Sequence, residues 1–400
     1  MNVAILGYGT VGSGVYDVLT KNAAIISKRA GFDLDVKYVL DLREFPGDPV
    51  EKILVHDFKQ VIDDPGVDVV VEVMGGIHPA YEFSKEALLR GKSVCTSNKE
   101  LVAKHGAELL ELARANNCNY LFEASVGGGI PIIRQLIRSI TADDIERIDG
   151  ILNGTTNYMM TKMKLDGLAF DEVLKRAQDK GYAERNPAAD IEGHDACRKI
   201  AILTSLAYGK QVDYEDIHTE GITKISDIDV EYANRLGRAI KLLGSSKKTE
   251  DGRVFAIVAP KMIKESNPLF MVSGVFNAIL IEGNMLGEVM CYGKGAGKLP
   301  TASAVVSDVI DAAKHAGKNI PIIWSREKLE LGSFADMKHA FFLRIPAYKK
   351  TDALDRLPVI QVLEDVKAGE IGVVTNEMTE GEFEKAVADL GVISMIRYEL

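Results

Sequence analysis

The segment that most constrains the fold is a glycine-rich hexapeptide, Gly7-Tyr8-Gly9-Thr10-Val11-Gly12. It follows an apolar run, Asn2 to Leu6, that predicts a short strand, and it leads into a helical pattern through Val15, Val18 and Leu19. In such a strand–glycine–helix succession the backbone can approach a pyrophosphate lying on the helix N-terminus. The alternative is a tight turn without a ligand. The context favours a dinucleotide site that includes Gly7, Gly9 and Gly12.

The second predicted strand ends at a charged pair of residues. It spans Leu34 to Leu40 and is followed by Asp41, where an acidic residue would bind the ribose hydroxyls of NAD. Arg43 comes two residues later and would instead suit the 2′-phosphate of NADP. Both NAD and NADP therefore stay open as the cofactor.

Strand and helix patterns then alternate. Strands are predicted at 67–74, 93–96 and 120–124, and helices at 79–90 and 100–116. Such repeats predict an α/β fold with a Rossmann-type, doubly wound parallel sheet, whose ligands lie at the carboxyl ends of the strands. Ser97 and Lys99 follow one strand, so Lys99 is expected to face the nicotinamide crevice. The alternative is a solvated lysine, although a cation is unfavourable at a helix N-terminus.

Two further glycine-rich segments are candidates for backbone contact with a ligand. The sequence Glu123-Ala124-Ser125-Val126-Gly127-Gly128-Gly129-Ile130-Pro131 ends the strand–helix repeats, and its three glycines suit either a ligand contact or a domain hinge. The second segment, 293–297, precedes a helix predicted at 302–316. It suits either a plain turn or packing against a nicotinamide ring.

From about residue 145 the pattern becomes that of an α+β domain. Strands are predicted at 145–152, 254–259 and 276–282, helices at 158–164 and 171–178, and a polar turn that could line a site at 153–157. A linker is predicted at 325–336. A small α+β module follows, with strands at 341–345, 371–374 and 392–398 and helices at 353–368 and 380–390.

A helix beginning near Asp195 carries charge into a segment that should be buried. Asp195 and Lys199 are four residues apart and share one face, which continues into apolar residues beyond Lys199. An isolated pair of this kind is usually a surface ion pair. Here Glu184 and Asp190 precede it, and a partly buried lysine among carboxylates can hold or relay a proton.

Composition limits the partners of the chain. With a net charge of −10 and a pI near 5.4, neither nucleic acid nor an anionic membrane is expected as a partner. No apolar run approaches the roughly 20 residues of a membrane span, so a cytoplasmic protein acting on small molecules is expected. The four scattered cysteines and seven histidines indicate neither a disulfide framework nor a caged transition metal.

Six separated motifs occur in order along the chain: GYGTVG, TSNKE, EASVGGGIPII, GILNGTTNY, GYAERNPAADIEGHDACRKIAIL and GKGAGKLPTAS. In these motifs the chain resembles the homoserine dehydrogenase family, from residue 2 to about residue 318. The resemblance implies the reversible, NAD(P)H-dependent reduction of L-aspartate 4-semialdehyde to L-homoserine, the branch towards threonine and methionine. The expected divisions are an NAD(P)-binding domain (1–130 plus about 298–320), a substrate-binding and dimerisation domain (131–297), a linker (321–338) and a C-terminal module (339–400).

The resemblance also implies roles for individual residues. Lys199 would protonate the nascent alkoxide, with Lys99 orienting or sharing that proton. Glu184 and Asp195 would bind the substrate, with Asp190 nearby. The family pattern further implies cofactor contacts at Tyr8, Thr10, Val11, Ser97, Lys99, Gly181 and Gly297, and a sodium-like cation bound mostly through backbone oxygens of Glu123, Val126, Gly128 and Ile130.

The same resemblance implies an ACT-like C-terminal module that starts at Phe342-Leu343-Arg344, although the predicted elements leave it one strand short. A homodimer or homotetramer is expected, paired through the sheet of the middle domain. Two alternatives remain from the residues themselves. One is a related semialdehyde oxidoreductase, and the other is a nucleotide-sensing regulatory protein in which Lys199 is merely structural.

Overall fold

The structure is a computed structural model that describes residues 1–400. The chain forms two compact units, each assembled from three segments. The first unit contains Met1–Ala142, Ala201–Asp213 and Gly293–Leu329, and the second contains Asp143–Ile200, Tyr214–Tyr292 and Glu330–Leu400.

The first unit is built on a six-stranded parallel sheet with the order β3-β2-β1-β4-β5-β6. Its strands are β1 (Asn2–Leu6), β2 (Asp35–Leu40), β3 (Leu54–Val55), β4 (Val69–Glu72), β5 (Ser93–Thr96) and β6 (Tyr120–Leu121). This is the strand order of a doubly wound dinucleotide fold. The predicted Rossmann-type sheet is therefore confirmed.

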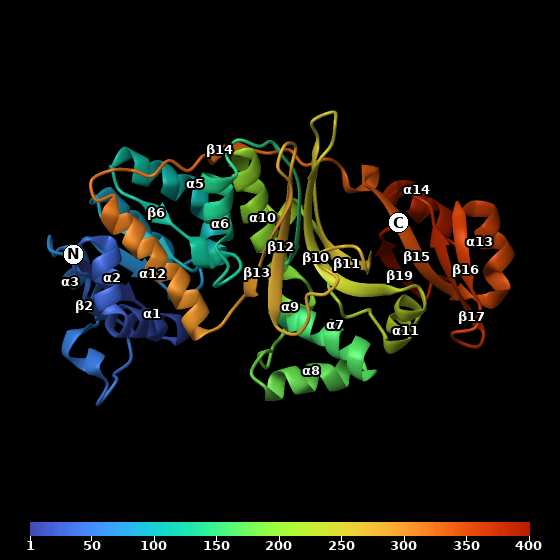
Figure 1. The fold of residues 1–400 in the computed structure, drawn as a ribbon, viewed down its shortest axis with the longest axis horizontal. Helices are drawn as coiled ribbons and strands as arrows, with labels where there is room; N and C mark the ends of the chain where they lie inside the picture. Colours follow the sequence, from blue (N-terminus) through green and yellow to red (C-terminus); the bar gives the residue numbers. More distant parts are fainter. The chain divides into compact units, whose positions relative to one another are not determined.

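Helices cover this sheet, and α1 and α12 lie side by side (Figure 1). The helices are α1 (Thr10–Lys21), α2 (Ala23–Ala30), α3 (Phe58–Ile62), α4 (Ala80–Leu89), α5 (Lys99–Ala115), α6 (Ile132–Arg134) and α12 (Lys298–Lys314). A Cβ atom on Gly14 of α1 would lie 2.8 Å from the carbonyl oxygen of Lys298, so only glycine permits this approach. Part of the segment predicted as a linker forms a short strand, β14 (Ser325–Lys328), which pairs with β8 (Lys210–Gln211).

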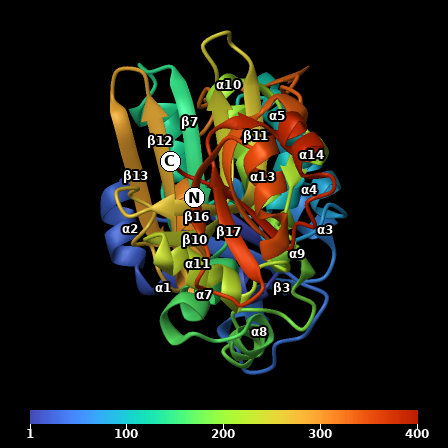
Figure 2. The same ribbon diagram turned by 90° about the vertical axis from the view of Figure 1, so that its right-hand side faces the viewer.

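The second unit contains an eleven-stranded sheet, whose main path runs β13-β12-β7-β10-β11-β19-β15-β17-β16. Figure 2 shows β13, β12 and β7 next to one another. The strands are β7 (Ile145–Ile151), β9 (His218–Thr219), β10 (Arg238–Lys248), β11 (Val254–Lys264), β12 (Phe276–Gly283), β13 (Gly287–Lys294), β15 (Lys338–Pro346), β16 (Val359–Leu363), β17 (Glu370–Thr375), β18 (Met378–Thr379) and β19 (Ser394–Tyr398). The parallel pairing of β11 with β19 joins the C-terminal strands to the rest of this sheet.

The helices of the second unit are α7 (Gly154–Asp166), α8 (Phe170–Asp179), α9 (Ala188–Ile191), α11 (Asp227–Arg235), α13 (Lys350–Arg356), α14 (Glu380–Val387) and the first half of α10 (His194–Tyr208). The polar turn predicted at 153–157 is wrong in part, because Gly154 already begins α7. Asn153 caps that helix by accepting a hydrogen bond from the Thr156 amide. The polar residues are thus fixed at a helix N-terminus.

The helix predicted at 353–368 is also wrong in part, because only its first residues, up to Arg356, are helical. Helix α13 ends at Arg356 and strand β16 begins at Val359, because Pro358 cannot continue a helix and holds Leu357 in an extended conformation. The β-branched residues that follow favour a strand. Apart from the two-residue strand β18, the C-terminal segment therefore has the order βαββαβ, and β16 is the longer of the two strands that the sequence-based prediction lacked.

Two apolar clusters hold the second unit together. One contains Leu243, Ile263 and Leu280, and the other contains Phe341 and Phe383, whose rings stack with centroids 3.9 Å apart. No helix in either unit is long and apolar enough to cross a membrane.

Candidate functional site

The glycine-rich turn between β1 and α1 uses each glycine differently. Gly7 has a φ of +94°, and a Cβ on Gly12 would lie 1.9 Å from the carbonyl oxygen of Gly7. Gly9 has open space on its Cβ side and is the N-cap of α1, with no side-chain hydrogen bond to the first helical amides. The turn therefore leaves the helix N-terminus open to an anion, as a bound pyrophosphate requires.

Asp41 lies at the end of β2 and is tied to this turn. Its carboxylate accepts a 2.7 Å hydrogen bond from the Tyr8 amide and two 2.9 Å hydrogen bonds from the Arg43 guanidinium. Hydrogen bonding from Arg43 outweighs burial and holds the pKa of Asp41 well below its usual range. The structure thus brings together the two residues that were predicted to select between NAD and NADP.

The ends of β4 and β5 are held by a buried carboxylate that the sequence analysis did not single out. Glu72 is fully buried and accepts hydrogen bonds from the Thr96 hydroxyl at 2.6 Å and the Met74 amide at 2.8 Å. Beyond Thr96, Asn98 donates to the carbonyl oxygen of Gly76 at 2.5 Å and caps α5. Ser97 and Lys99 are therefore fixed at the carboxyl edge of the sheet, with Lys99 as the first residue of α5.

Glu72 lies within an apolar run and carried no motif. Its partner Thr96 lies opposite it only because β4 and β5 pair in the sheet, and no local sequence pattern indicates that pairing.

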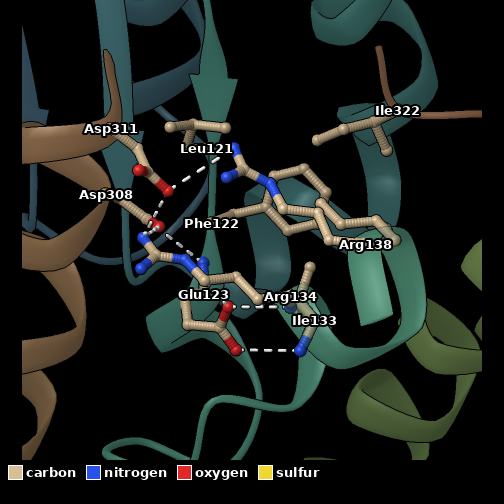
Figure 3. A pocket seen from close by; sticks show the side chains of 10 residues that line it. Leu121, Phe122, Glu123, Ile133, Arg134, Arg138, Asp308, Asp311 and Ile322 are labelled. Carbon is tan, nitrogen blue, oxygen red and sulfur yellow. Dashed lines mark hydrogen bonds and ion pairs between the residues drawn. The ribbon is translucent and has the colours of Figure 1, made fainter. Parts of the chain in front are cut away.

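A second buried carboxylate organises the segment after β6 (Figure 3). The Glu123 side chain accepts hydrogen bonds from the amides of Ile133 and Arg134 at 2.8 and 2.9 Å, and the Glu123 amide donates to Asp308 at 2.8 Å. Arg134 donates to Asp308 at 2.6 Å and also pairs with Asp311. Burial, with the nearby charge of Asp308, raises the pKa of Glu123 to about 7. Both side-chain oxygens of Glu123 thus accept hydrogen bonds from backbone amides of the protein.

The three consecutive glycines pack against another glycine-rich segment. A Cβ on Gly128 would lie 2.5 Å from the carbonyl oxygen of Gly295, and one on Gly129 would lie 2.9 Å from Pro300. The Gly129 amide donates to the carbonyl oxygen of Lys294 at 3.1 Å. Gly297, the N-cap of α12, has a φ of +114°. The glycines therefore permit close contact between two segments of the first unit. The candidate cation residues Glu123, Val126, Gly128 and Ile130 lie in one of these segments, between β6 and α6.

The candidate substrate residues of the second unit centre on α10. Lys199 donates to the carboxylate of Asp195 at 2.7 Å and to the carbonyl oxygen of Leu152 at 2.8 Å. Asp195 is 3% exposed and Lys199 is 8% exposed, so this is a buried pair and not a surface ion pair. A lysine held by two such hydrogen bonds is fixed in direction.

Asn153 joins the buried pair to a second carboxylate. Its amide nitrogen donates to Asp190 at 2.7 Å and to Asp195 at 2.8 Å, while its oxygen caps α7. The sequence indicated only that the turn containing Asn153 could line a site. The structure adds Asn153 to the candidate residues as the bridge between Asp190 and Asp195.

Two predicted residues lie outside this buried cluster. Glu184 is exposed, and its carbonyl oxygen accepts a hydrogen bond from Gln178. Gly181 is exposed, has a φ of +70° and follows α8. Both belong to the connection between α8 and α9, whereas Asp190, Asp195 and Lys199 come together around Asn153.

Comparisons with known proteins agree with this geometry. The family model described as homoserine dehydrogenase matches residues 131–310, and the model of the NAD-binding domain of homoserine dehydrogenase matches residues 7–123. The homoserine dehydrogenase of Bacillus subtilis is 36% identical, over 99% of this chain and 96% of its own length.

Solved structures agree as well. A homoserine dehydrogenase from Thiobacillus denitrificans has a TM-score of 0.91 at 36% identity, over 100% of this chain and 98% of that one. A hyperthermophilic archaeal homoserine dehydrogenase mutant in complex with NADPH has a TM-score of 0.68 at 29% identity, over 80% of this chain and 99% of that one. With a dinucleotide-type turn in one unit and a buried lysine–carboxylate cluster in the other, this chain belongs to the homoserine dehydrogenase family of oxidoreductases.

Proposed function

We propose that Lys199 is the acid/base of the homoserine dehydrogenase reaction and that Asp195 and Asp190 hold the amino-acid substrate. The observation that supports this proposal is the buried contact of Lys199 with Asp195, at 2.7 Å, in a cluster bridged by Asn153. In the reducing direction the aldehyde carbon of L-aspartate 4-semialdehyde accepts a hydride and its oxygen accepts a proton. A bound nicotinamide supplies that hydride.

Lys199 suits the proton-transfer role because its side-chain nitrogen is held in one direction and is little exposed to water. Negative charge develops on the substrate oxygen as the hydride arrives, and a cation at that point stabilises it and can give up a proton. Asp195 holds the ammonium of Lys199 in a fixed direction. In the oxidising direction the same lysine would accept the proton from the hydroxyl of homoserine.

Asp190 and Asp195 would meet the substrate ammonium group, which is the cationic end of both aspartate semialdehyde and homoserine. Glu184 is proposed as a further substrate contact on the connection that follows Gly181. Lys99 is proposed to orient or share the proton, because it lies at the carboxyl edge of the nucleotide-type sheet, where ligands of such folds bind.

The turn from Gly7 to Gly12, with Ser97 and Gly297, is proposed to hold NAD or NADP. Asp41 would bind the ribose hydroxyls of NAD, and Arg43 would bind the 2′-phosphate of NADP. Because Arg43 already neutralises Asp41, the carboxylate need not repel that phosphate. The NADPH complex of the archaeal relative supports a nicotinamide cofactor.

The turn from Glu123 to Ile130 is proposed to hold a sodium-like cation. The Glu123 carboxylate is engaged by two amides, so main-chain oxygens of Glu123, Val126, Gly128 and Ile130 would be the ligands, and hard oxygen donors suit such an ion.

Apart from the two-residue strand β18, the elements of residues 338–398 have the order βαββαβ, which supports an ACT-like C-terminal module. A homodimer or homotetramer is also proposed, paired through the sheet of the second unit.

The substrate assignment is tested by steady-state kinetics of homoserine oxidation with Asp195→Asn and Asp190→Asn. Each should raise the KM for homoserine by about tenfold or more, because a hydrogen bond to a charged group contributes roughly 1.5–3 kcal/mol. The KM for the nicotinamide should change little. Unchanged KM values for homoserine in both variants would remove these two carboxylates from the substrate site.

A further inference from the structure

A buried arginine ties the last strand of the chain to its middle. Arg397 of β19 is 2% exposed, and it donates to Glu380 at 2.6 Å and to Glu220 at 2.8 Å. Glu380 is the first residue of α14 and is equally buried, whereas Glu220 follows the short strand β9. A buried guanidinium is tolerated only where carboxylates surround it, so Arg397 fixes the position of both glutamates.

Glu220 is held on several sides. Its carboxylate also contacts His218 at 2.6 Å, and its amide donates to the carbonyl oxygen of Val258 on β11 at 2.7 Å. Burial opposes ionisation of Glu220, but the hydrogen bonds from His218 and Arg397 outweigh it and lower the pKa of Glu220 to about 2. The segment from His218 to Glu220 is therefore anchored to the sheet at one side and to Arg397 at the other.

The residues after Glu220 lie directly against the turn between α9 and α10. A Cβ on Gly221 would lie 2.0 Å from the carbonyl oxygen of Ile191 and 2.4 Å from the Cα of Glu192. The Ile222 amide donates to the carbonyl oxygen of Ile191 at 2.8 Å. On the other side, a Cβ on Gly193 would lie 3.3 Å from the carbonyl oxygen of Glu220. At Gly221 backbone thus meets backbone directly, whereas Gly193 also packs against the side chains of Thr219 and Val258. Such close packing transmits displacement.

The two carboxylates of the candidate substrate site flank that turn, with Asp190 in α9 and Asp195 in α10. The Gly193 amide donates to the carbonyl oxygen of Asp190, and α10 begins with His194, directly before Asp195. We infer that Arg397 and Glu220 are positioning residues, which set Asp190 and Asp195 for the amino-acid substrate through the contact of Gly221 with Ile191. This inference rests on the proposed substrate role of Asp190 and Asp195.

Arg344 offers a matched control in the same C-terminal segment. It is also buried, at 4% exposed, and it also bridges two carboxylates, Asp229 at 3.0 Å and Glu370 at 2.6 Å. Arg344 also donates to the Ser226 hydroxyl at 2.9 Å, so its partners at this end lie in and next to the first turn of α11, whereas Arg397 binds Glu220, directly before Gly221. Loss of either arginine should therefore destabilise the protein, but only the loss of Arg397 should move the substrate carboxylates.

The experiment compares full-length Arg397→Met and Arg344→Met with the wild type, using Tm and the two KM values of homoserine oxidation. Both variants should lower Tm. Arg397→Met should raise the KM for homoserine about tenfold, with the KM for the nicotinamide within about twofold, since small displacements of substrate-binding groups have large effects. Arg344→Met should leave both KM values near those of the wild type.

Glu220 provides the second variant, because its side chain is 32% exposed and its replacement is the milder change. Glu220→Ala should raise the KM for homoserine in the same way. Glu220→Gln keeps an oxygen that accepts from Arg397 and should restore most of the affinity, which a general loss of stability would not do.

Equal KM values for homoserine in Arg397→Met and Arg344→Met, or in Glu220→Ala and the wild type, would overturn the inference. Asp195→Asn separates its failure from that of the proposed function. If Asp195→Asn raises this KM while Glu220→Ala does not, only the positioning role fails. If Asp195→Asn and Asp190→Asn both leave the KM unchanged, the proposed substrate site fails as well.

Discussion

The Nζ atom of Lys199 lies 2.7 Å from a carboxylate oxygen of Asp195, one turn earlier on α10, and both side chains are buried. The same spacing on an exposed helix contributes only about 0.3–0.5 kcal/mol. Burial changes the consequences of removing either partner, because the one that remains must be accommodated as an uncompensated charge.

Asp195→Ala should therefore lower the free energy of unfolding by about 3–5 kcal/mol, whereas the double variant Asp195→Ala/Lys199→Met should lose less. The measurement is urea unfolding at pH 7.5 of the wild type, both single variants and the double variant. A double variant that is at least as destabilised as Asp195→Ala would contradict the view that the two charges depend on each other.

Replacing Arg43 should affect the KM for NADPH much more than the KM for NADH. Arg43→Ala removes the guanidinium that binds Asp41 through two hydrogen bonds, so the carboxylate would repel a 2′-phosphate and no cation would bind it. The KM for NADPH should rise by about ten- to a hundredfold, while the KM for NADH should change little. Equal effects on both cofactors would show that Arg43 does not contact the 2′-phosphate.

Acid should remove a contribution to stability that depends on Glu220. The pKa of Glu220 is depressed to about 2 in the folded protein, so the ionised side chain stabilises the fold above its unfolded pKa of about 4.5. That contribution should be lost as the pH falls from about 4.5 to about 2. In urea unfolding across this range, Glu220→Gln should show a weaker pH dependence than the wild type. Parallel curves for the two proteins would contradict the assignment.

Two glycines with positive φ should respond differently to alanine. Gly128 has a φ of +53° and would place a Cβ 2.5 Å from the carbonyl oxygen of Gly295, whereas Gly31 has a φ of +88° and open space around it. Gly31→Ala should cost about 1–2 kcal/mol from backbone strain alone. Gly128→Ala should cost about 1–3 kcal/mol more, because it also forces two backbones apart. Similar urea midpoints for both variants would mean that the contact between the two turns is loose.

The nucleotide-binding unit was predictable because its signals are local. The run of apolar residues before Gly7, the glycine spacing and the alternation of strands and helices each depend on neighbours in the chain, and they located five of its six strands. The missed strand, β3, contains only Leu54 and Val55, too few residues for a pattern.

The second unit was less predictable because its buried surfaces carry polar residues. Strand β10 contains Lys241 and the run Gly244-Ser245-Ser246, although most of the strand is buried. Lys241 lies there because the carbonyl oxygen of Val272 and the side chain of Asn157 accept its hydrogen bonds, and both partners are distant in sequence. Glu72 and Asn153 likewise form hydrogen bonds with residues distant in sequence, so the sequence alone did not single out Glu72 and did not assign a function to Asn153.

The most direct test of the account is the kcat of Lys199→Ala for homoserine-dependent reduction of the oxidised nicotinamide. It should be measured at saturating concentrations of both substrates, with cofactor binding followed separately by fluorescence. If Lys199 transfers the proton, kcat should fall by about 10²-fold or more while the cofactor affinity stays within about twofold. Near-normal turnover in a folded Lys199→Ala variant would contradict the central role assigned to the buried pair.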